Sequence, residues 1–218
     1  MATKPQKRLE FYYDVISPYS WFAFEVLMRY KKHWDIQVDL KPFLLAGVMK
    51  STGNAAPMLV PNRGVYMFSD LSRNAKYFNV PLKVISDPHT ALFERGSLTP
   101  NRFLTAVDLL FPEHVESVSR ALWSELWNKD EDITSPETLI RVGQSAGLNK
   151  EQLIQVQSHM SAQVTKDRLK NYTTEAVEYG AFGSPTIIAH YGDKPMLFFG
   201  SDRFPVLAQE IGEKIKLR

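Results

Sequence analysis

Alternating strand patterns occur near both ends of the chain and are absent from its long middle, which constrains the possible folds severely. Apolar and polar residues alternate from Arg8 to Val15 and predict a first strand. Helical spacing predicts a helix from Pro18 to about Lys32, and a second alternation that begins at Ile36 predicts a strand parallel to the first. The N-terminal part therefore has the pattern of a strand-helix-strand unit.

The rest of the chain divides into a helical block and a C-terminal hairpin. Apolar residues at helical spacing predict helices over 65–78, 101–110, 112–127, 136–146, 150–157 and 162–179. Segments 186–189 and 196–199 flank a turn-rich stretch and predict a β-hairpin, followed by a helix from Ser201 to about Lys216. Residues 44–61 are rich in Gly, Asn and Pro and predict a long loop or broken helix without a regular element. The expected fold is an α/β sheet domain split by a helical insertion.

Composition excludes several classes of protein. The net charge is +2 and the basic residues form no stripe, so we expect no nucleic-acid partner. No apolar run approaches the roughly 20 residues that span a bilayer, and MATKPQKRLE lacks the apolar stretch of a secretory signal, so we expect an intracellular protein without membrane insertion. Cysteine is absent and the five histidines lack metal-ligand spacing, so we expect no disulfide and no metal site.

Two motifs mark positions where chemistry is expected. Ser17 and Pro18 lie where the first strand ends and a helix begins, and the unpaired N–H groups and dipole of a helix N-terminus favour an anion there. Ser184 and Pro185 precede the first hairpin strand, where a cis bond would turn the backbone outward to pair with an extended peptide. An ordinary helix cap and an ordinary turn are the alternative readings, and they stay open at this point.

Two further groups suit the ends of a small zwitterionic ligand. Ser201 can donate to a carboxylate at a helix start, and Asp202 can accept an ammonium group. Asn54 and Arg63 can bind a second carboxylate. Helix capping for the first pair and simple solvation for the second pair are the alternatives.

Three segments, FYYDVISPYSW, EYGAFGSPT and FFGSDR, resemble the kappa-class glutathione transferases. LxxGVMKxxGNxxP around Asn54, GSLTPNRFLTAV at 96–107 and DIT near Thr134 extend the resemblance over nearly the whole chain. That family has a thioredoxin domain interrupted by a helical domain, and its topology is related to DsbA-type oxidoreductases and to 2-hydroxychromene-2-carboxylate isomerases. The resemblance implies a thioredoxin-like glutathione-binding domain over 1–62 and 181–218, with a DsbA-like helical insertion over 63–180.

The resemblance implies that Ser17 is the catalytic serine. Its hydroxyl would hold the sulfur of glutathione, the co-substrate, as a thiolate that attacks small electrophiles or reduces hydroperoxides. Ser17 and Ser20 occupy the positions of the two cysteines of Cys-x-x-Cys in DsbA-like enzymes. The alternatives are a glutathione-dependent cis–trans isomerase of the 2-hydroxychromene-2-carboxylate type and a non-catalytic module that binds peptides.

The same resemblance implies a glutathione site. The residues implied to bind the tripeptide are Pro18, Tyr19, Asn54, Arg63, Ser184, Pro185, Ser201 and Asp202. In this chain Arg63 replaces a lysine of known relatives, which keeps the charge but changes the donor geometry. Ser184 replaces a leucine, and we expect little loss because the implied contact is through the backbone. The resemblance also implies a homodimer and a mitochondrial or peroxisomal location, with the cytoplasm open as a third compartment.

Overall fold

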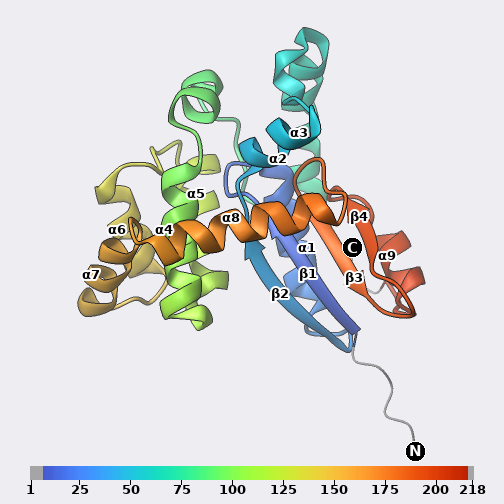
Figure 1. The fold of residues 1–218 in the computed structure, drawn as a ribbon. Helices are drawn as coiled ribbons and strands as arrows, with labels where there is room; N and C mark the ends of the chain where they lie inside the picture. The colour runs from blue at the N-terminus through green and yellow to red at the C-terminus, as the bar shows by residue number, and fades with distance from the viewer. Residues whose placement is uncertain (1–6, 216–218) are drawn as a thin grey trace, which may run out of the picture.

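The computed structural model describes residues 7–215, in which a four-stranded sheet is flanked by helices (Figure 1). The strands are β1 (Lys7–Tyr13), β2 (Ile36–Pro42), β3 (Thr186–His190) and β4 (Met196–Phe199). The α-helices are α1 (Pro18–Tyr30), α2 (Leu45–Thr52), α3 (Pro61–Phe78), α4 (Leu98–Leu110), α5 (Val115–Trp127), α6 (Pro136–Ser145), α7 (Lys150–His159), α8 (Gln163–Glu178) and α9 (Phe204–Glu210). Short 3₁₀ turns cover Pro57–Leu59 and Pro112–His114, and a π-helix covers Thr90–Arg95. The strands and helices that the sequence predicts occur in the predicted order, and α2 and the π-helix are additional elements.

The sheet topology brings the two ends of the chain together. The strand order is β2-β1-β3-β4, with β1 parallel to β2 and antiparallel to β3. Phe11 pairs with Leu40 on one side and with Ile187 on the other. Because β1 and β3 run in opposite directions, the end of β1 lies beside the start of β3. The segment before α1 therefore meets the segment before β3.

One face of the sheet carries the main apolar core. Leu9, Phe11 and Tyr13 alternate along β1 and point to this face, and all three are fully buried. The ring of Phe11 lies 6.3 Å from that of Phe24 in α1, and the ring of Tyr13 lies 5.3 Å from that of Trp123 in α5. The core thus joins the sheet to α1 and to the helical insertion.

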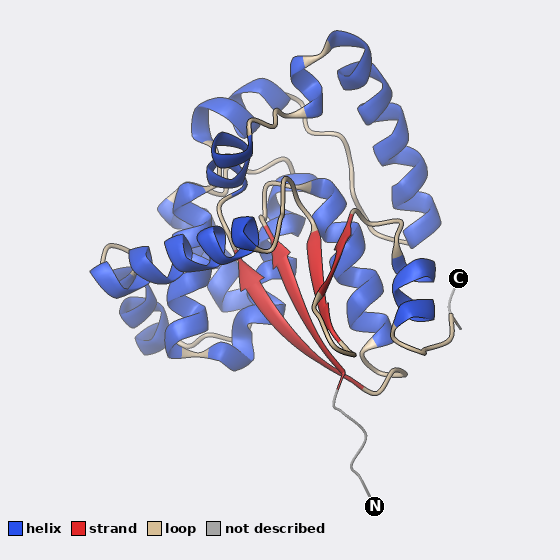
Figure 2. Cartoon of the chain, turned by 45° about the vertical axis from the view of Figure 1, so that its right-hand side comes forward, coloured by secondary structure: helices blue, strands red, loops and turns tan. Residues whose placement is uncertain are grey.

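On the opposite face of the sheet, a smaller apolar cluster joins the strands to α2 and α8, and Figure 2 shows the sheet with helices on both of its sides. Tyr12 and Ile188 pack there against Val48 of α2 and Ala176 of α8. Glu10 of β1 points to the same side and is only 2% exposed. A buried carboxylate requires partners, which β1 itself and the neighbouring strands β2 and β3 supply.

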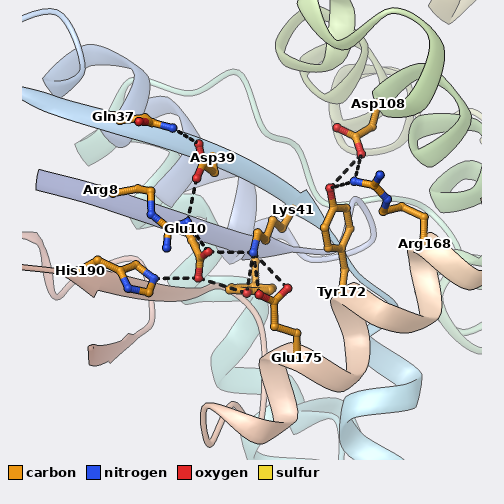
Figure 3. A network of polar contacts seen from close by, with 11 residues as sticks. Arg8, Glu10, Gln37, Asp39, Lys41, Asp108, Arg168, Tyr172, Glu175 and His190 are labelled. Atoms are coloured by element: carbon orange, nitrogen blue, oxygen red, sulfur yellow. Dashed lines mark hydrogen bonds and ion pairs between the residues drawn. The ribbon is translucent and has the colours of Figure 1, made fainter. Parts of the chain in front are cut away.

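A network of charged side chains surrounds Glu10 (Figure 3). Glu10 pairs with Arg8 at 2.5 Å, with Lys41 at 2.8 Å and with His190 at 2.9 Å. Lys41 also pairs with Glu175 of α8 at 2.8 Å. Burial alone would raise the pKa of Glu10, but the hydrogen bonds and charges of these neighbours outweigh it and lower the pKa from 4.5 to about 2. The network fastens α8 to the middle of the sheet.

The helical insertion lies beyond the β2 edge of the sheet. Figure 1 shows α4, α5, α6 and α7 gathered there, with α8 running from that group across the sheet. Helix α3 stands apart from them and packs against α1. The predicted domain boundaries at 63 and 180 lie close to the start of α3 and the end of α8, and the division into two domains stays a prediction.

The expectation of no regular element within 44–61 is wrong, because α2 is a regular helix over Leu45–Thr52. No side chain caps its N-terminus locally; the N–H of Leu45 donates to the carboxylate of Asp14 at 2.8 Å. Gly53 ends the helix with a φ of 69°, in the left-handed region. A contact with a residue more than thirty positions away supplies the missing cap, and sequence pattern does not reveal such contacts.

The last helix is shorter than predicted. It covers Phe204–Glu210, whereas the pattern predicted a helix from Ser201 to about Lys216. Ser201 and Asp202 form a turn before it, and Lys216 lies outside the described residues. The π-helix over Thr90–Arg95 was not predicted either.

Candidate functional site

Ser17 lies in the turn between β1 and α1, at the N-cap of α1. Its hydroxyl oxygen accepts a hydrogen bond from the N–H of Ser20 at 3.2 Å, and the side chain is buried with 5% exposure. Pro18 occupies the first helical position and has no N–H, and the N–H of Tyr19 has no acceptor among the described residues. The free N–H and the helix dipole favour an anion at this turn.

Two tryptophans of α5 donate hydrogen bonds to the backbone of the Ser17 turn. Trp123 donates its indole N–H to the carbonyl oxygen of Ser17 at 3.2 Å, and Trp127 donates to the carbonyl oxygen of Ile16 at 3.3 Å. The sequence predicts that both tryptophans pack between helices, which is correct but incomplete. Their spacing of four residues gives one helix face, but nothing in it indicates which carbonyl groups they contact.

Ser184 and Pro185 lie directly beside the Ser17 turn, and the peptide bond between them is cis. The hydroxyl of Ser17 donates to the carbonyl oxygen of Ser184 at 3.4 Å. The hydroxyl oxygens of Ser184 and Ser20 are 2.6 Å apart. The structure thus brings Ser17, Ser184 and Pro185 together as predicted and adds Ser20, which sequence reasoning placed in the motif but not among the site residues.

Tyr19 links the first turn of α1 to α3. Its hydroxyl donates to a carboxylate oxygen of Asp70 at 2.8 Å, and burial, followed by that carboxylate, raises its pKa above the usual range. Tyr19 therefore stays neutral, and its side chain faces α3. Only its backbone lies at the Ser17 turn. The sequence did not identify Asp70 as the partner of the Tyr19 hydroxyl.

Asn54 and Arg63 are both exposed. The side-chain amide of Asn54 donates to the carbonyl oxygen of Phe182 at 2.6 Å, which ties the end of α2 to the loop that carries Ser184. Arg63 lies in the first turn of α3 and has no hydrogen bond or ion pair with another described residue. The structure thus connects Asn54 to the Ser184 loop, whereas it records no contact between Arg63 and the other predicted site residues.

Ser201 and Asp202 follow β4 in a turn that is fastened to Pro185. The N–H of Gly200 donates to the carbonyl oxygen of Pro185 at 3.1 Å. Ser201 is buried, and Asp202 is exposed and paired with Arg203 at 2.5 Å. Ser201 and Asp202 border a cavity of about 200 Å³ between α1, α3 and α9, and Ser17 does not line it.

The described residues contain no group of three or more His, Asp or Glu side chains that could hold a metal ion. Within residues 7–215, no helix is both long and apolar enough to span a membrane.

Comparison with known proteins identifies the fold family. Residues 8–212 match the model of the DSBA-like thioredoxin domain family. A solved structure of 2-hydroxychromene-2-carboxylate isomerase superimposes with a TM-score of 0.77 at 19% identity, covering 94% of each chain. These findings define the chain as a DsbA-like thioredoxin-fold protein and confirm the predicted fold class.

More similar relatives define the family within that fold. The chain is 41% identical over 208 residues to human glutathione S-transferase kappa 1, covering 95% of this chain and 92% of the relative. The protein of the same description from Rattus norvegicus is 42% identical over 206 residues, covering 94% and 91%. A 2-hydroxychromene-2-carboxylate isomerase from Pseudomonas putida is 24% identical over 209 residues, covering 94% of each. The chain belongs to the kappa class of glutathione S-transferases, which confirms the family identified from the sequence.

Proposed function

We propose that the chain binds glutathione at the junction of the Ser17 turn and the Ser184 loop and activates its thiol as a thiolate. The observation that carries this proposal is the place of the Ser17 hydroxyl, at the N-terminus of α1 and within 3.4 Å of the carbonyl oxygen before cis-Pro185. Ser17 donates a hydrogen bond to the sulfur, and the N–H of Tyr19 adds a second donor. The thiolate then attacks an electrophilic carbon, which releases its leaving group, or the terminal oxygen of a hydroperoxide, whose O–O bond breaks to release an alcohol while the sulfur is oxidised to a sulfenic acid.

The energy required for this activation is within reach of the groups present. A free thiol has a pKa near 8.5, and lowering it by about two units requires about 2.7 kcal/mol. A hydrogen bond to a charged group contributes about 1.5 to 3 kcal/mol, and a helix N-terminus adds about 0.3 to 1 kcal/mol. The hydroxyl of Ser17 gives up little when it turns to the sulfur, because its bond to Ser184 is already long at 3.4 Å.

The other predicted site residues contact the three parts of glutathione in turn. The backbone of Ser184 pairs with the cysteinyl residue, because its side chain already faces Ser20. Ser201 and Asp202, beside Pro185, bind the γ-glutamyl end. Asn54 and Arg63 face the glycine end, where Arg63 is a cation without a protein partner among the described residues. A homodimer and a mitochondrial or peroxisomal location belong to the same proposal, and both are supported by the family alone.

The proposal is tested by steady-state turnover of glutathione with a chlorodinitrobenzene electrophile. We expect Ser17→Ala to lower kcat by about 100-fold while KM for glutathione changes by less than about threefold, because the hydroxyl contacts only the sulfur and binding is spread over many groups. Ser145→Ala is the matched control: it removes a serine hydroxyl whose hydrogen bond stays within α6, and it should keep kcat. Unchanged kcat in Ser17→Ala contradicts the proposed role of the serine.

The isomerase reading is decided by a parallel assay with a chromene-type carboxylic acid. The match to the Pseudomonas putida isomerase makes this the second reaction to measure. Fast glutathione-dependent isomerisation together with weak conjugation would replace the transferase reaction by reversible thiolate addition, with the same role for Ser17.

A further inference from the structure

Asp14 carries a carboxylate that is buried without a cationic partner. The residue is fully buried, and the described residues form no ion pair with it. Its oxygens accept hydrogen bonds from the N–H of Ile16 at 3.0 Å, the N–H of Leu45 at 2.8 Å and the hydroxyl of Ser97 at 2.8 Å. Burial raises the pKa of Asp14 above its usual range, and these hydrogen bonds oppose the increase. A buried carboxylate is costly unless all its partners stay in place.

The three donors belong to the beginnings of three helices. Ile16 lies in the turn that leads into α1, Leu45 is the first residue of α2, and Ser97 is the N-cap residue of α4. Ser97 makes no side-chain cap on its own helix, although serine is a favoured capping residue. Its hydroxyl instead reaches across to Asp14. The carboxylate is therefore the common anchor of the three segments.

The backbone of Asp14 also holds both sides of the site. Its carbonyl oxygen accepts from the N–H of Ser17 at 3.0 Å, which closes the turn that presents the Ser17 hydroxyl. Its N–H donates to the hydroxyl oxygen of Ser184 at 3.2 Å. A displacement of Asp14 would move Ser17 and Ser184 together.

We propose that Asp14 is a positioning residue: its carboxylate fixes the Ser17 turn against the first residues of α2 and α4, so that the helical insertion determines where the Ser17 hydroxyl lies. This inference rests on the proposed function and adds to it a role for a residue that does not contact glutathione. Ser97, the N-cap residue of α4, donates to this carboxylate, and the side chain of Asn101 in α4 also favours its ionised form, so these two residues link Asp14 to that helix.

Four variants separate positioning from stability. Asp14→Asn keeps the side-chain shape but replaces one acceptor oxygen by a donor. Ser97→Ala removes the hydrogen bond from the N-cap residue of α4, and Ser97→Thr retains a hydroxyl and serves as the rescue variant. Tyr13→Phe is the matched control, because it is the neighbouring buried residue of β1 and loses one bond to the insertion, that between its hydroxyl and Ser119 at 2.7 Å.

The first readout needs no glutathione. Amide hydrogen exchange of the ligand-free protein is followed at Ser17 and Leu45, whose N–H groups are held by Asp14. We expect exchange at both amides to be at least about tenfold faster in Asp14→Asn and unchanged in Tyr13→Phe, because only the first change releases these segments. Unchanged exchange at Ser17 in Asp14→Asn overturns the proposal.

The second readout is the pKa of the bound glutathione thiol, followed by ultraviolet difference absorbance. We expect it to rise by about one unit in Asp14→Asn, less in Ser97→Ala, and to return to the wild-type value in Ser97→Thr. If Asp14→Asn and Ser97→Ala lose only thermal stability, as Tyr13→Phe does, the positioning role is wrong. If wild-type protein forms no thiolate, the proposed function is wrong, and the exchange readout alone decides whether Asp14 positions Ser17.

Discussion

The hydroxyl oxygens of Ser20 and Ser184 lie 2.6 Å apart although 164 residues separate them in the chain. The contact joins the first turn of α1 to the loop before β3, and the same Ser184 hydroxyl accepts the N–H of Asp14 at 3.2 Å. The side chain of Ser184 is thereby turned into the scaffold. We therefore expect Ser184 to contact the ligand through its backbone, as in the pairing of two extended peptides.

Ser184→Ala should therefore act on stability and leave glutathione binding nearly unchanged. We expect a loss of about 1 to 2 kcal/mol in the free energy of unfolding, because a short hydrogen bond is lost and the N–H of Asp14 loses its acceptor. KM for glutathione should change by less than about twofold. Urea unfolding of Ser20→Ala, Ser184→Ala and the double variant gives the coupling between the two hydroxyls. Strictly additive losses would show that the contact contributes nothing.

Arg63→Ala should weaken glutathione binding and leave stability unchanged. The side chain of Arg63 makes no hydrogen bond or ion pair with another described residue, so Arg63→Ala should leave the melting temperature unchanged and raise KM for glutathione by about five- to tenfold through loss of a charge-paired contact. Arg63→Lys should recover part of the affinity, because it keeps the charge without the planar fork. Arg73→Ala on the same helix is the control for general charge effects. An unchanged KM in Arg63→Ala removes Arg63 from the site.

Glu10 should make stability depend on pH in the acid range. Its pKa is lowered from 4.5 to about 2 in the folded chain, so its contribution is complete above about pH 5 and is lost as pH falls from about 4.5 toward 2. Glu10→Gln should lower the free energy of unfolding by about 2 to 3 kcal/mol at pH 7, and the difference from wild type should shrink below pH 4.5.

The control for Glu10 is Glu175→Gln, which alters a half-exposed partner of the same lysine. We expect that change to cost less than about 1 kcal/mol at any pH, as is usual for exposed ion pairs. Urea titrations of the three proteins between pH 3 and 7 give the comparison. A Glu10→Gln deficit that stays constant over this range would contradict the lowered pKa.

The fold was largely predictable because its signals are local. Alternation along β1 and β2 and helical spacing from α3 to α8 are set by which residues face the core, and each pattern can be followed along the chain. Helix α2 was missed because its cap comes from Asp14 in another segment. The helix α9 was predicted too long because its pattern continues beyond Glu210, whereas Gly212 adopts a φ of 68° soon afterwards.

The site was predictable in part. The N-cap role of Ser17 is local, since it depends on a serine followed by proline and a helical pattern. The bonds that complete the site join residues far apart: Ser20 with Ser184, Asp14 with Ser97, and Trp123 with Ser17. From the sequence, Asp14 is only a polar residue near the end of an alternating strand pattern, which reveals neither its burial nor its partners.

The role of the Ser17 hydroxyl is tested by the thiol pKa of glutathione bound to wild type and to Ser17→Ala, measured by ultraviolet difference absorbance across pH. We expect wild-type protein to hold the thiol as a thiolate with a pKa about two units below 8.5, and Ser17→Ala to lose most of this shift while it still binds glutathione. The same depressed pKa in both proteins would contradict the central role of the Ser17 hydroxyl.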